Sequence, residues 1–113
     1  MKKLDLSFVK GDTFSFSFEV SGITDDLASA YFSCKESEDD STSYSFQKSL
    51  TNGITKLENG KYQVRVAPED TASLEAGTYY YDLELGIGSD IFTILMGKLV
   101  LIQDITIDEP SSE

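Results

Sequence analysis

The sequence predicts an all-β protein, an antiparallel β-sandwich or small barrel of about seven strands. Apolar and polar residues alternate with a period of two along several parts of the chain. Residues typical of turns separate these runs every eight to twelve residues or so. No segment keeps a 3.6-residue apolar period, so we expect no long helix.

The clearest alternating run covers residues 14–20. Phe14, Phe16, Phe18 and Val20 alternate there with serines and a glutamate. This pattern predicts a strand with one buried face and one solvated face. The other alternating runs place these residues on buried faces: Ala30, Phe32, Cys34, Tyr62, Val64, Val66, Tyr79, Tyr81, Leu83 and Leu85. Tyr31 is the large exception, because it falls on the solvated face of its strand.

Turns are expected at residues 10–12 and 21–26. Asn59-Gly60 separates residues 54–57 from residues 61–66, and Asn-Gly favours the positive φ angles of a tight hairpin. Asn52-Gly53 predicts a second turn of the same kind. Residues 36–43 hold acids and serines without an apolar residue, which predicts a solvated loop.

Two features remain toward the C-terminus. Pro68 and the acids after it predict one helical turn at residues 68–71. Residues 91–102 are apolar on both faces within a strand that extends to Ile107, so this strand is central or a partner covers it. Gly97 is expected to mark a bulge or bend. We expect one domain over residues 1–107 and an acidic, flexible tail over residues 108–113.

A local motif favours the sandwich over the barrel. The run Gly77-Thr78-Tyr79-Tyr80-Tyr81 resembles the start of the sixth strand of an immunoglobulin-like domain. Tyr79 then takes the place of the tyrosine corner, with its hydroxyl bonded to the backbone of residues 70–74, and Tyr81 takes the place of the cysteine. The sequence has no second cysteine, so Phe16 or Phe18 stands at the partner position and aromatic packing replaces the disulfide.

Composition excludes several kinds of chemistry. The chain of 113 residues has no histidine and one cysteine, which excludes disulfide frameworks, cysteine–histidine zinc sites and histidine-dependent triads. Cys34 is in phase with Phe32, which predicts a buried thiol. The acids fall in loops and in the tail, so we expect no enzyme and no cofactor. Calcium binding by residues 36–43 is left open, although the run lacks the glycine and the Asp-x-Asp spacing of a calcium loop.

The net charge of −11 limits the partners. Nucleic-acid backbones and anionic lipids both require a basic surface, so we expect neither partner. The N-terminus lacks the apolar run of a signal peptide, and no apolar stretch is long enough to span a bilayer. We therefore expect synthesis in a cytoplasm without secretion by a signal peptide.

The order of motifs resembles a family. An entry Gly11-Asp12-Thr13-Phe14 opens the phenylalanine strand, and residues 52–55 and 59–66 read Asn-Gly-Ile-Thr and Asn-Gly-Lys-Tyr-Gln-Val-Arg-Val. Pro-Glu-Asp-Thr leads into Gly-Thr-Tyr-Tyr-Tyr-Asp-Leu over residues 68–83, and Gly-Lys-Leu-Val-Leu closes the pattern at residues 97–101. Together they resemble small phage and prophage virion proteins with an immunoglobulin-like domain, nearest the N-terminal domain of the phage baseplate upper protein. The resemblance implies a structural module in a virion tail or baseplate, which is made in the host cytoplasm and docks to other virion subunits.

Five residues are candidates for an interface. Tyr31, Tyr44 and Tyr80 are out of phase with the core, and exposed tyrosines suit protein interfaces or stacking on sugars. Ile91 and Ile94 belong to the apolar C-terminal run, which predicts contact with a virion subunit or a homo-oligomer. Two other functions stay open: an acidic inhibitor or DNA mimic, because of the net charge, and a carbohydrate-binding module that uses the three tyrosines.

Overall fold

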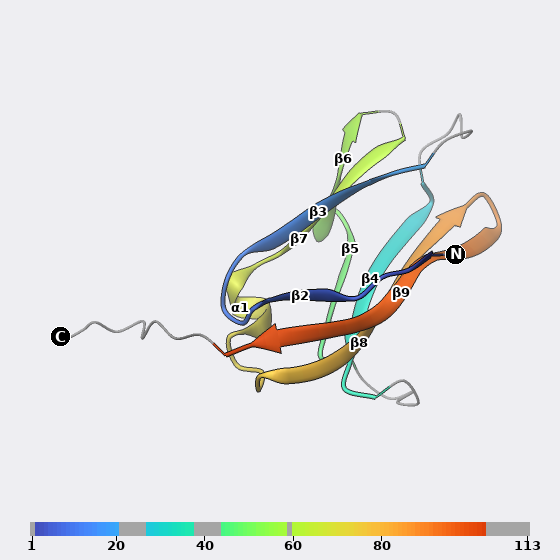
Figure 1. Cartoon of the computed structure of the whole chain (residues 1–113). Coiled ribbons are helices and arrows are strands. Elements are labelled where there is room, and N and C mark those ends of the chain that lie inside the picture. Colours follow the sequence, from blue (N-terminus) through green and yellow to red (C-terminus); the bar gives the residue numbers. More distant parts are fainter. Residues whose placement is uncertain (1, 21–26, 38–43, 59, 104–113) are drawn as a thin grey trace.

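The strands form two facing layers (Figure 1) in a computed structural model that describes residues 2–20, 27–37, 44–58 and 60–103. One layer contains β3 (Phe14–Glu19), β7 (Lys61–Val66) and β6 (Gly53–Glu58), in that order. The other contains β9 (Asp90–Ile102), β8 (Gly77–Ile87), β4 (Ser29–Lys35) and β5 (Phe46–Leu50). The N-terminal strands β1 (Lys2–Lys3) and β2 (Leu6–Val9) both run parallel to β9 along its outer edge.

The strand order is that of an immunoglobulin-like sandwich. Strands β3, β7 and β6 stand in the order of strands B, E and D, and β9, β8 and β4 stand in the order of strands G, F and C. Strand β5 extends the second layer beyond β4, as in variable-type domains. The predicted fold class, an immunoglobulin-like β-sandwich without a disulfide, is confirmed, and the single cysteine is free and buried.

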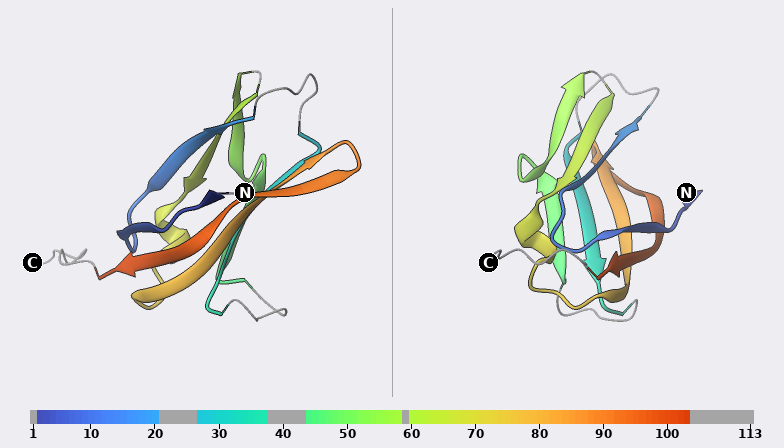
Figure 2. Two further views of the ribbon diagram at one scale, coloured as in Figure 1. Left: turned by 45° about the vertical axis from the view of Figure 1, so that its right-hand side comes forward. Right: turned by 60° about the vertical axis from the view of Figure 1, so that its left-hand side comes forward.

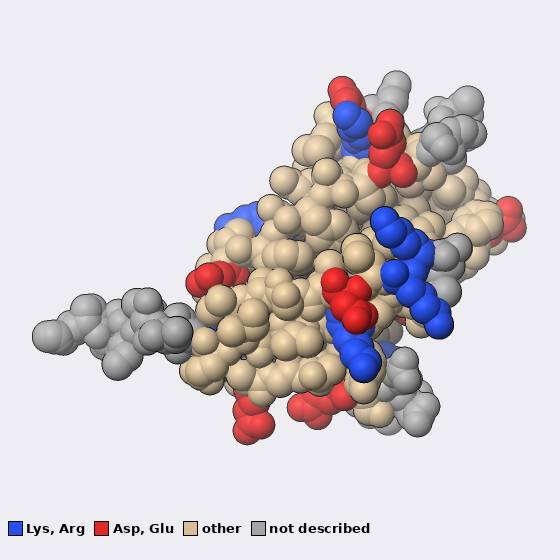
Figure 3. Space-filling model, viewed as in Figure 1, with Lys and Arg blue, Asp and Glu red and all other residues tan. Residues whose placement is uncertain are grey.

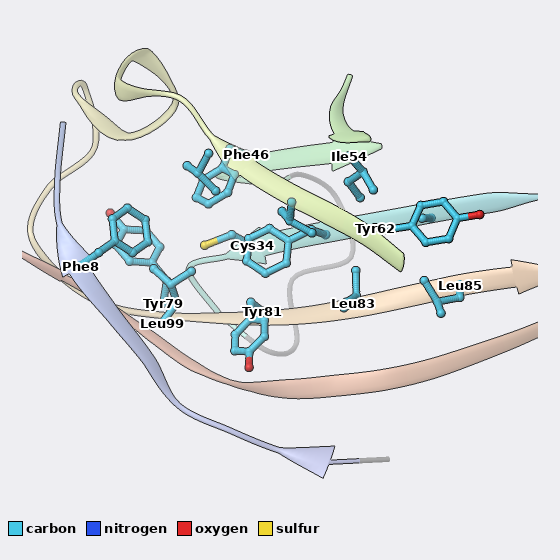
Figure 4. Packing of buried hydrophobic residues seen from close by; sticks show 14 of the residues in the cluster. Phe8, Cys34, Phe46, Ile54, Tyr62, Tyr79, Tyr81, Leu83, Leu85 and Leu99 are labelled. Carbon is cyan, nitrogen blue, oxygen red and sulfur yellow. The ribbon is translucent and has the colours of Figure 1, made fainter. Parts of the chain in front are cut away.

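Aromatic rings fill the space between the layers (Figure 4). Phe32 is fully buried, and its ring lies 5.4 Å from Tyr81 and 5.5 Å from Phe16, measured between centroids. Because Tyr81 stands where the cysteine of strand F would be, this chain of rings connects the two layers where other immunoglobulin-like domains carry a disulfide. The buried hydrophobic residues are Phe8, Leu27, Ala30, Phe32, Cys34, Phe46, Ile54, Tyr62, Val64, Val66, Tyr79, Tyr81, Leu83, Leu85, Leu99 and Leu101.

The corner before β8 follows the expected pattern with one shift. The Tyr79 hydroxyl donates a hydrogen bond to the Glu75 carbonyl oxygen over 2.8 Å, one residue beyond the segment expected to hold it. The expected helical turn is present as α1 (Pro68–Thr71). Its last residue, Thr71, is fully buried and accepts a hydrogen bond from the Gly11 N–H over 2.8 Å. Helix α1 is therefore tied to the turn between β2 and β3.

Strand β5 was not foreseen in the sequence, because its residues show no alternation. Its Lys48 forms an ion pair with Asp70 of α1 over 2.7 Å, and both side chains are largely buried. The Asp70 carboxylate also accepts a hydrogen bond from the Ala67 N–H over 2.7 Å. The ion pair ties α1 to β5 of the second layer, and the hydrogen bond caps the start of α1.

The expected burial of the phenylalanine strand is partly wrong. Phe14, Phe16 and Phe18 do point toward the core, but all three are half-buried and none is fully enclosed. The physical reason is position, because β3 is the last strand of its layer. The alternation identified the inward face correctly and did not reveal that this strand lies at an edge.

The second Asn-Gly turn is not a hairpin. Strands β5 and β6 pair in parallel through only two residue pairs, Ser49 with Gly53 and Leu50 with Ile54. The chain passes from one layer to the other here, and Thr51 takes a φ of 64° to make the crossing. Asn59-Gly60 behaves as expected, because β6 and β7 pair antiparallel on either side of it.

The role expected of Gly97 is also wrong. The bulge of β9 lies at Ile94, between the pairs of Leu83 with Leu95 and Glu84 with Thr93. Gly97 is instead a point of close approach, since a Cβ there would lie 2.3 Å from the Leu4 carbonyl oxygen. Within the described residues, the chain's own N-terminal strands pair with residues 95, 96 and 99–102 of β9. The turn at 21–26, most of the acidic run 36–43 and the tail 108–113 lie outside the described residues.

Candidate functional site

A groove crosses the outer face of the β9–β8–β4–β5 layer, on the side away from the core. It is open to solvent and has a volume of about 660 Å³. The residues that line it are Lys3, Asp5, Tyr31, Ser33, Lys35, Tyr44, Gln47, Tyr80, Tyr81, Asp82, Glu84, Met96, Gly97 and Lys98. A volume of this size falls within the usual range of sites that hold a small molecule or an anchoring side chain.

Strand alternation explains why these residues meet. Tyr31, Ser33 and Lys35 share the outer face of β4, and every second residue from Tyr80 shares the outer face of β8. The antiparallel register then sets Tyr31 beside Glu84, and Lys35 beside Tyr80. The groove is therefore built on rigid, paired strands.

The three candidate tyrosines of the sequence line this one groove. Tyr31 is 38% exposed, Tyr44 is 50% exposed, and Tyr80 is half-buried. The Lys35 ammonium lies 5.4 Å from the centre of the Tyr44 ring, a distance at which cation and ring attract each other. The rings come from the adjacent strands β4 and β8 and from Tyr44, two residues before β5.

The two isoleucines proposed for the interface lie elsewhere. Ile91 is 61% exposed near the tip of the β8–β9 hairpin, and it does not line the groove. Ile94 is half-buried and packs against the core. The structure thus brings together three of the five candidate interface residues and leaves the isoleucines apart from them.

Polar side chains form the floor of the groove. Ser33 is nearly fully buried, although the alternation placed it on the solvated face, because Gln47 covers it and donates a hydrogen bond to its hydroxyl over 3.0 Å. Burial raises the pKa of the adjacent Asp82 carboxyl, and the negative charge of Glu84 raises it further, while Lys35 opposes both effects. Ionisation of Asp82 therefore costs more in the folded protein than in water, and groups with such shifted pKa values are common at binding sites.

The N-terminal segment forms one wall of the groove. The Asp5 carboxylate accepts a hydrogen bond from the Lys98 N–H over 3.1 Å, and the Leu4 N–H donates to the Met96 carbonyl oxygen over 2.9 Å. The Tyr81 hydroxyl reaches from the core to the Leu4 carbonyl oxygen, and burial raises the pKa of this phenol. Sequence reasoning missed this wall, because no local pattern pairs the N-terminus with residues more than ninety positions away.

Burial raises the pKa of the Cys34 thiol to about 12, so this thiol stays protonated and is a poor nucleophile. Among the residues that the structure describes, no three of the His, Cys, Asp and Glu side chains gather closely enough to hold a metal ion. Within the same residues, no helix has the length and apolar character needed to cross a membrane.

Comparisons with known proteins identify no family. No family model matches the chain, and no curated protein matches it. One similar solved structure is a putative glycoside hydrolase from Bacteroides vulgatus ATCC 8482, with 17% identity, a TM-score of 0.48, and coverage of 92% of this chain and 17% of that chain. Another is the NK cell receptor Nkp44, described as a triggering partner in natural cytotoxicity, with 17% identity, a TM-score of 0.48, and coverage of 91% of this chain and 97% of that chain. Neither similarity bears on function.

Proposed function

We propose that this protein is a non-enzymatic interaction module, which docks to another protein through the groove on the β9–β8–β4–β5 layer. The observation that carries the proposal is the convergence of Tyr31, Tyr44 and Tyr80 with Asp82 in one concavity. Tyrosines are enriched at the centres of protein interfaces, since their rings bury a large area at a small entropic cost.

The partner we propose is another subunit of a phage or prophage tail or baseplate. The sequence motifs that resemble small virion proteins support this assignment. The immunoglobulin-like sandwich fits it, because such a domain offers rigid outer faces for docking. The groove would then face a neighbouring subunit in the assembled particle.

The charge of the groove disfavours the DNA-mimic alternative. Its lining includes three lysines, Lys3, Lys35 and Lys98, beside three carboxylates. Acidic and basic side chains are also interspersed on the face that Figure 3 shows. A surface that imitates the phosphates of a nucleic acid needs a continuous run of one charge.

Carbohydrate binding is the second candidate, and a specific observation favours it. The groove combines tyrosine rings with the polar groups of Ser33, Gln47 and Asp82, which is the mixture that orients a small polar ligand. Titration with soluble polysaccharides and with disaccharides, followed by the chemical shifts of the groove tyrosines, separates this candidate from protein docking. Saturable shifts with a sugar support it, and unchanged shifts at millimolar sugar exclude it.

Photo-crosslinking tests the docking proposal. A photoreactive amino acid is placed at Tyr31 or Tyr44, and at Leu57 as the control, because Leu57 is 52% exposed on β6 and does not line the groove. In cells that assemble the particle, both groove positions should give a covalent adduct with one tail or baseplate subunit, and Leu57 should give none. Groove positions that yield no adduct, or the same adducts as Leu57, would contradict the proposal.

A further inference from the structure

The outer edge of β3 has no partner strand among the described residues. Strand β3 ends the strand path and pairs with β7 alone. A strand A lies beside this position in immunoglobulin domains. Here the N-terminal strands run along β9 on the opposite layer instead, and β3 stands at the margin of its own layer (Figure 2).

The backbone groups along this edge point outward in a regular order. The Val20 N–H donates to the Gly60 carbonyl oxygen over 2.7 Å, in register with the β3–β7 pairing. Successive residues of a strand point their N–H groups to opposite sides. The N–H and C=O groups of Ser15, Ser17 and Glu19 therefore point away from β7, toward the open edge.

Within the part of the chain that the structure describes, this edge lacks the usual protection against pairing. Proteins guard such edges with lysine, proline, bulges or a covering loop. Strand β3 reads Phe-Ser-Phe-Ser-Phe-Glu, and its one charge is at its end. The surface over β3 is largely uncharged in Figure 3, and the three phenylalanines are half-buried.

We propose that β3 pairs antiparallel with β3 of a second copy of this chain, around a two-fold axis at Phe16. Ser15 then lies opposite Ser17 of the partner copy, and Phe14 lies opposite Phe18 of the partner copy. Each Phe16 lies opposite its own counterpart. The result is one continuous sheet of six strands, β6–β7–β3 from each copy.

The strand is complementary to itself in this register. Ser15 and Ser17 both point their backbone groups outward, so they can exchange N–H···O=C bonds as a hydrogen-bonded pair. Phenylalanines meet phenylalanines on the inner face, and such cross-strand aromatic pairs stabilise a sheet. The antiparallel direction also sets the two Glu19 side chains at opposite ends, so no like charges face each other. The β3 of a second copy can therefore supply hydrogen-bond partners for the unpaired backbone groups of this edge.

This inference is independent of the proposed function, because β3 and the groove belong to different layers. It also replaces the C-terminal strand as the route to self-association, since β1 and β2 already pair with β9. The net charge of −11 makes two copies repel each other, and salt screens this repulsion and shortens its range. The dimer should therefore be stronger at physiological salt than at low salt.

A charge-swap experiment tests the pairing. Ser15 and Ser17 are exposed, so both can be replaced without disturbing the core. In S15K/S17K each new lysine faces a lysine of the partner copy, and in S15K/S17E each faces an opposite charge. S15K/S17K adds two positive charges and so reduces the magnitude of the net negative charge of −11. This by itself would favour association, so a loss of dimer has to come from the local repulsion.

Sedimentation over micromolar concentrations gives the readout. We expect a wild-type dimer, a dissociation constant raised about tenfold in S15K/S17K, and a dimer retained in S15K/S17E. A wild type that stays monomeric at both salt concentrations, or equal dissociation constants for the wild type and S15K/S17K, would overturn the inference.

Hydrogen exchange on the wild type needs no variant, so this test remains valid if S15K/S17K fails to fold. The Ser15 and Ser17 amides should gain protection as the protein concentration rises. Exchange rates that do not depend on protein concentration would also overturn the inference. This result is expected if a different protein, and not a second copy, covers the edge.

Discussion

Single side chains carry the features that distinguish this sandwich from immunoglobulin domains with a disulfide. Tyr81 occupies the position of a cysteine, and Phe32 links it to Phe16 across the core. Tyr79 ties β8 to the corner before it through one hydrogen bond. On the outer face, burial raises the pKa of the Asp82 carboxyl.

Tyr79→Phe removes the corner hydrogen bond and leaves the ring in place. We expect a loss of about 0.5–1.5 kcal/mol in the free energy of unfolding, because the Glu75 carbonyl oxygen loses a donor. Tyr80→Phe is the matched control and should change stability little, since Tyr80 lines the open groove. Denaturant titrations that give equal losses for the two variants would show that the corner bond contributes nothing.

Asp82→Asn should raise stability at neutral pH. The folded protein holds the Asp82 proton more tightly than the unfolded chain does, because the folded-state pKa is raised. The free energy of unfolding of the wild type therefore falls as pH rises through the range between the ordinary and the raised pKa. The melting temperature of Asp82→Asn should exceed that of the wild type at pH 7, and the difference should shrink near pH 3 or so, where both forms are neutral. A variant that melts below the wild type at pH 7 would contradict this account.

At the scale of elements, lateral position decides how deeply a strand is buried. Strand β4 lies between β5 and β8, and its inward residues Ala30, Phe32 and Cys34 are almost fully enclosed. Strand β3 has the same alternation at the end of its layer, and its phenylalanines are half-buried. The inward side chains of the same alternating pattern therefore contribute more to stability in a central strand than in an edge strand.

A pair of alanine substitutions measures this difference. Phe32→Ala should cost about 3–5 kcal/mol, as expected for a fully enclosed ring. Phe16→Ala should cost less, about 2–3 kcal/mol, since part of the Phe16 ring is already exposed to solvent. Ser17→Ala on the solvated face should stay within about 0.5 kcal/mol. Denaturant titrations at low protein concentration measure these losses in the free energy of unfolding. Equal losses for Phe32→Ala and Phe16→Ala would mean that β3 is as fully buried as β4.

Gly97→Ala tests the close approach of the N-terminal segment to β9. The new Cβ would meet the Leu4 carbonyl oxygen at 2.3 Å, so the segment has to move. We expect a loss of about 1–3 kcal/mol in stability and faster exchange of the Leu4 amide, which donates to Met96. Unchanged exchange at Leu4 would show that the segment tolerates the methyl group.

At the scale of the whole molecule, the sequence predicted the fold class and three of the residues that line the groove. Alternation identified the inward faces, and the aromatics out of phase with it, Tyr31 and Tyr80, line the groove with Tyr44. Local patterns contain no information about which distant segments pair. The wall made by Lys3 and Asp5, the edge position of β3 and the crossing after β5 all depend on such pairing, and they emerged only from the structure.

The central claim is that the groove on the β9–β8–β4–β5 layer docks this protein into a particle. Quantitative mass spectrometry of purified particles tests it most directly, with the double variant Tyr31→Ala/Tyr80→Ala and the control Leu57→Ala. The wild type and the control should be present at one fixed ratio to the other subunits, and the groove variant should fall about tenfold, because buried interface tyrosines carry much of the binding free energy. A wild type absent from the particles, or a folded groove variant present at the wild-type ratio, would contradict the claim.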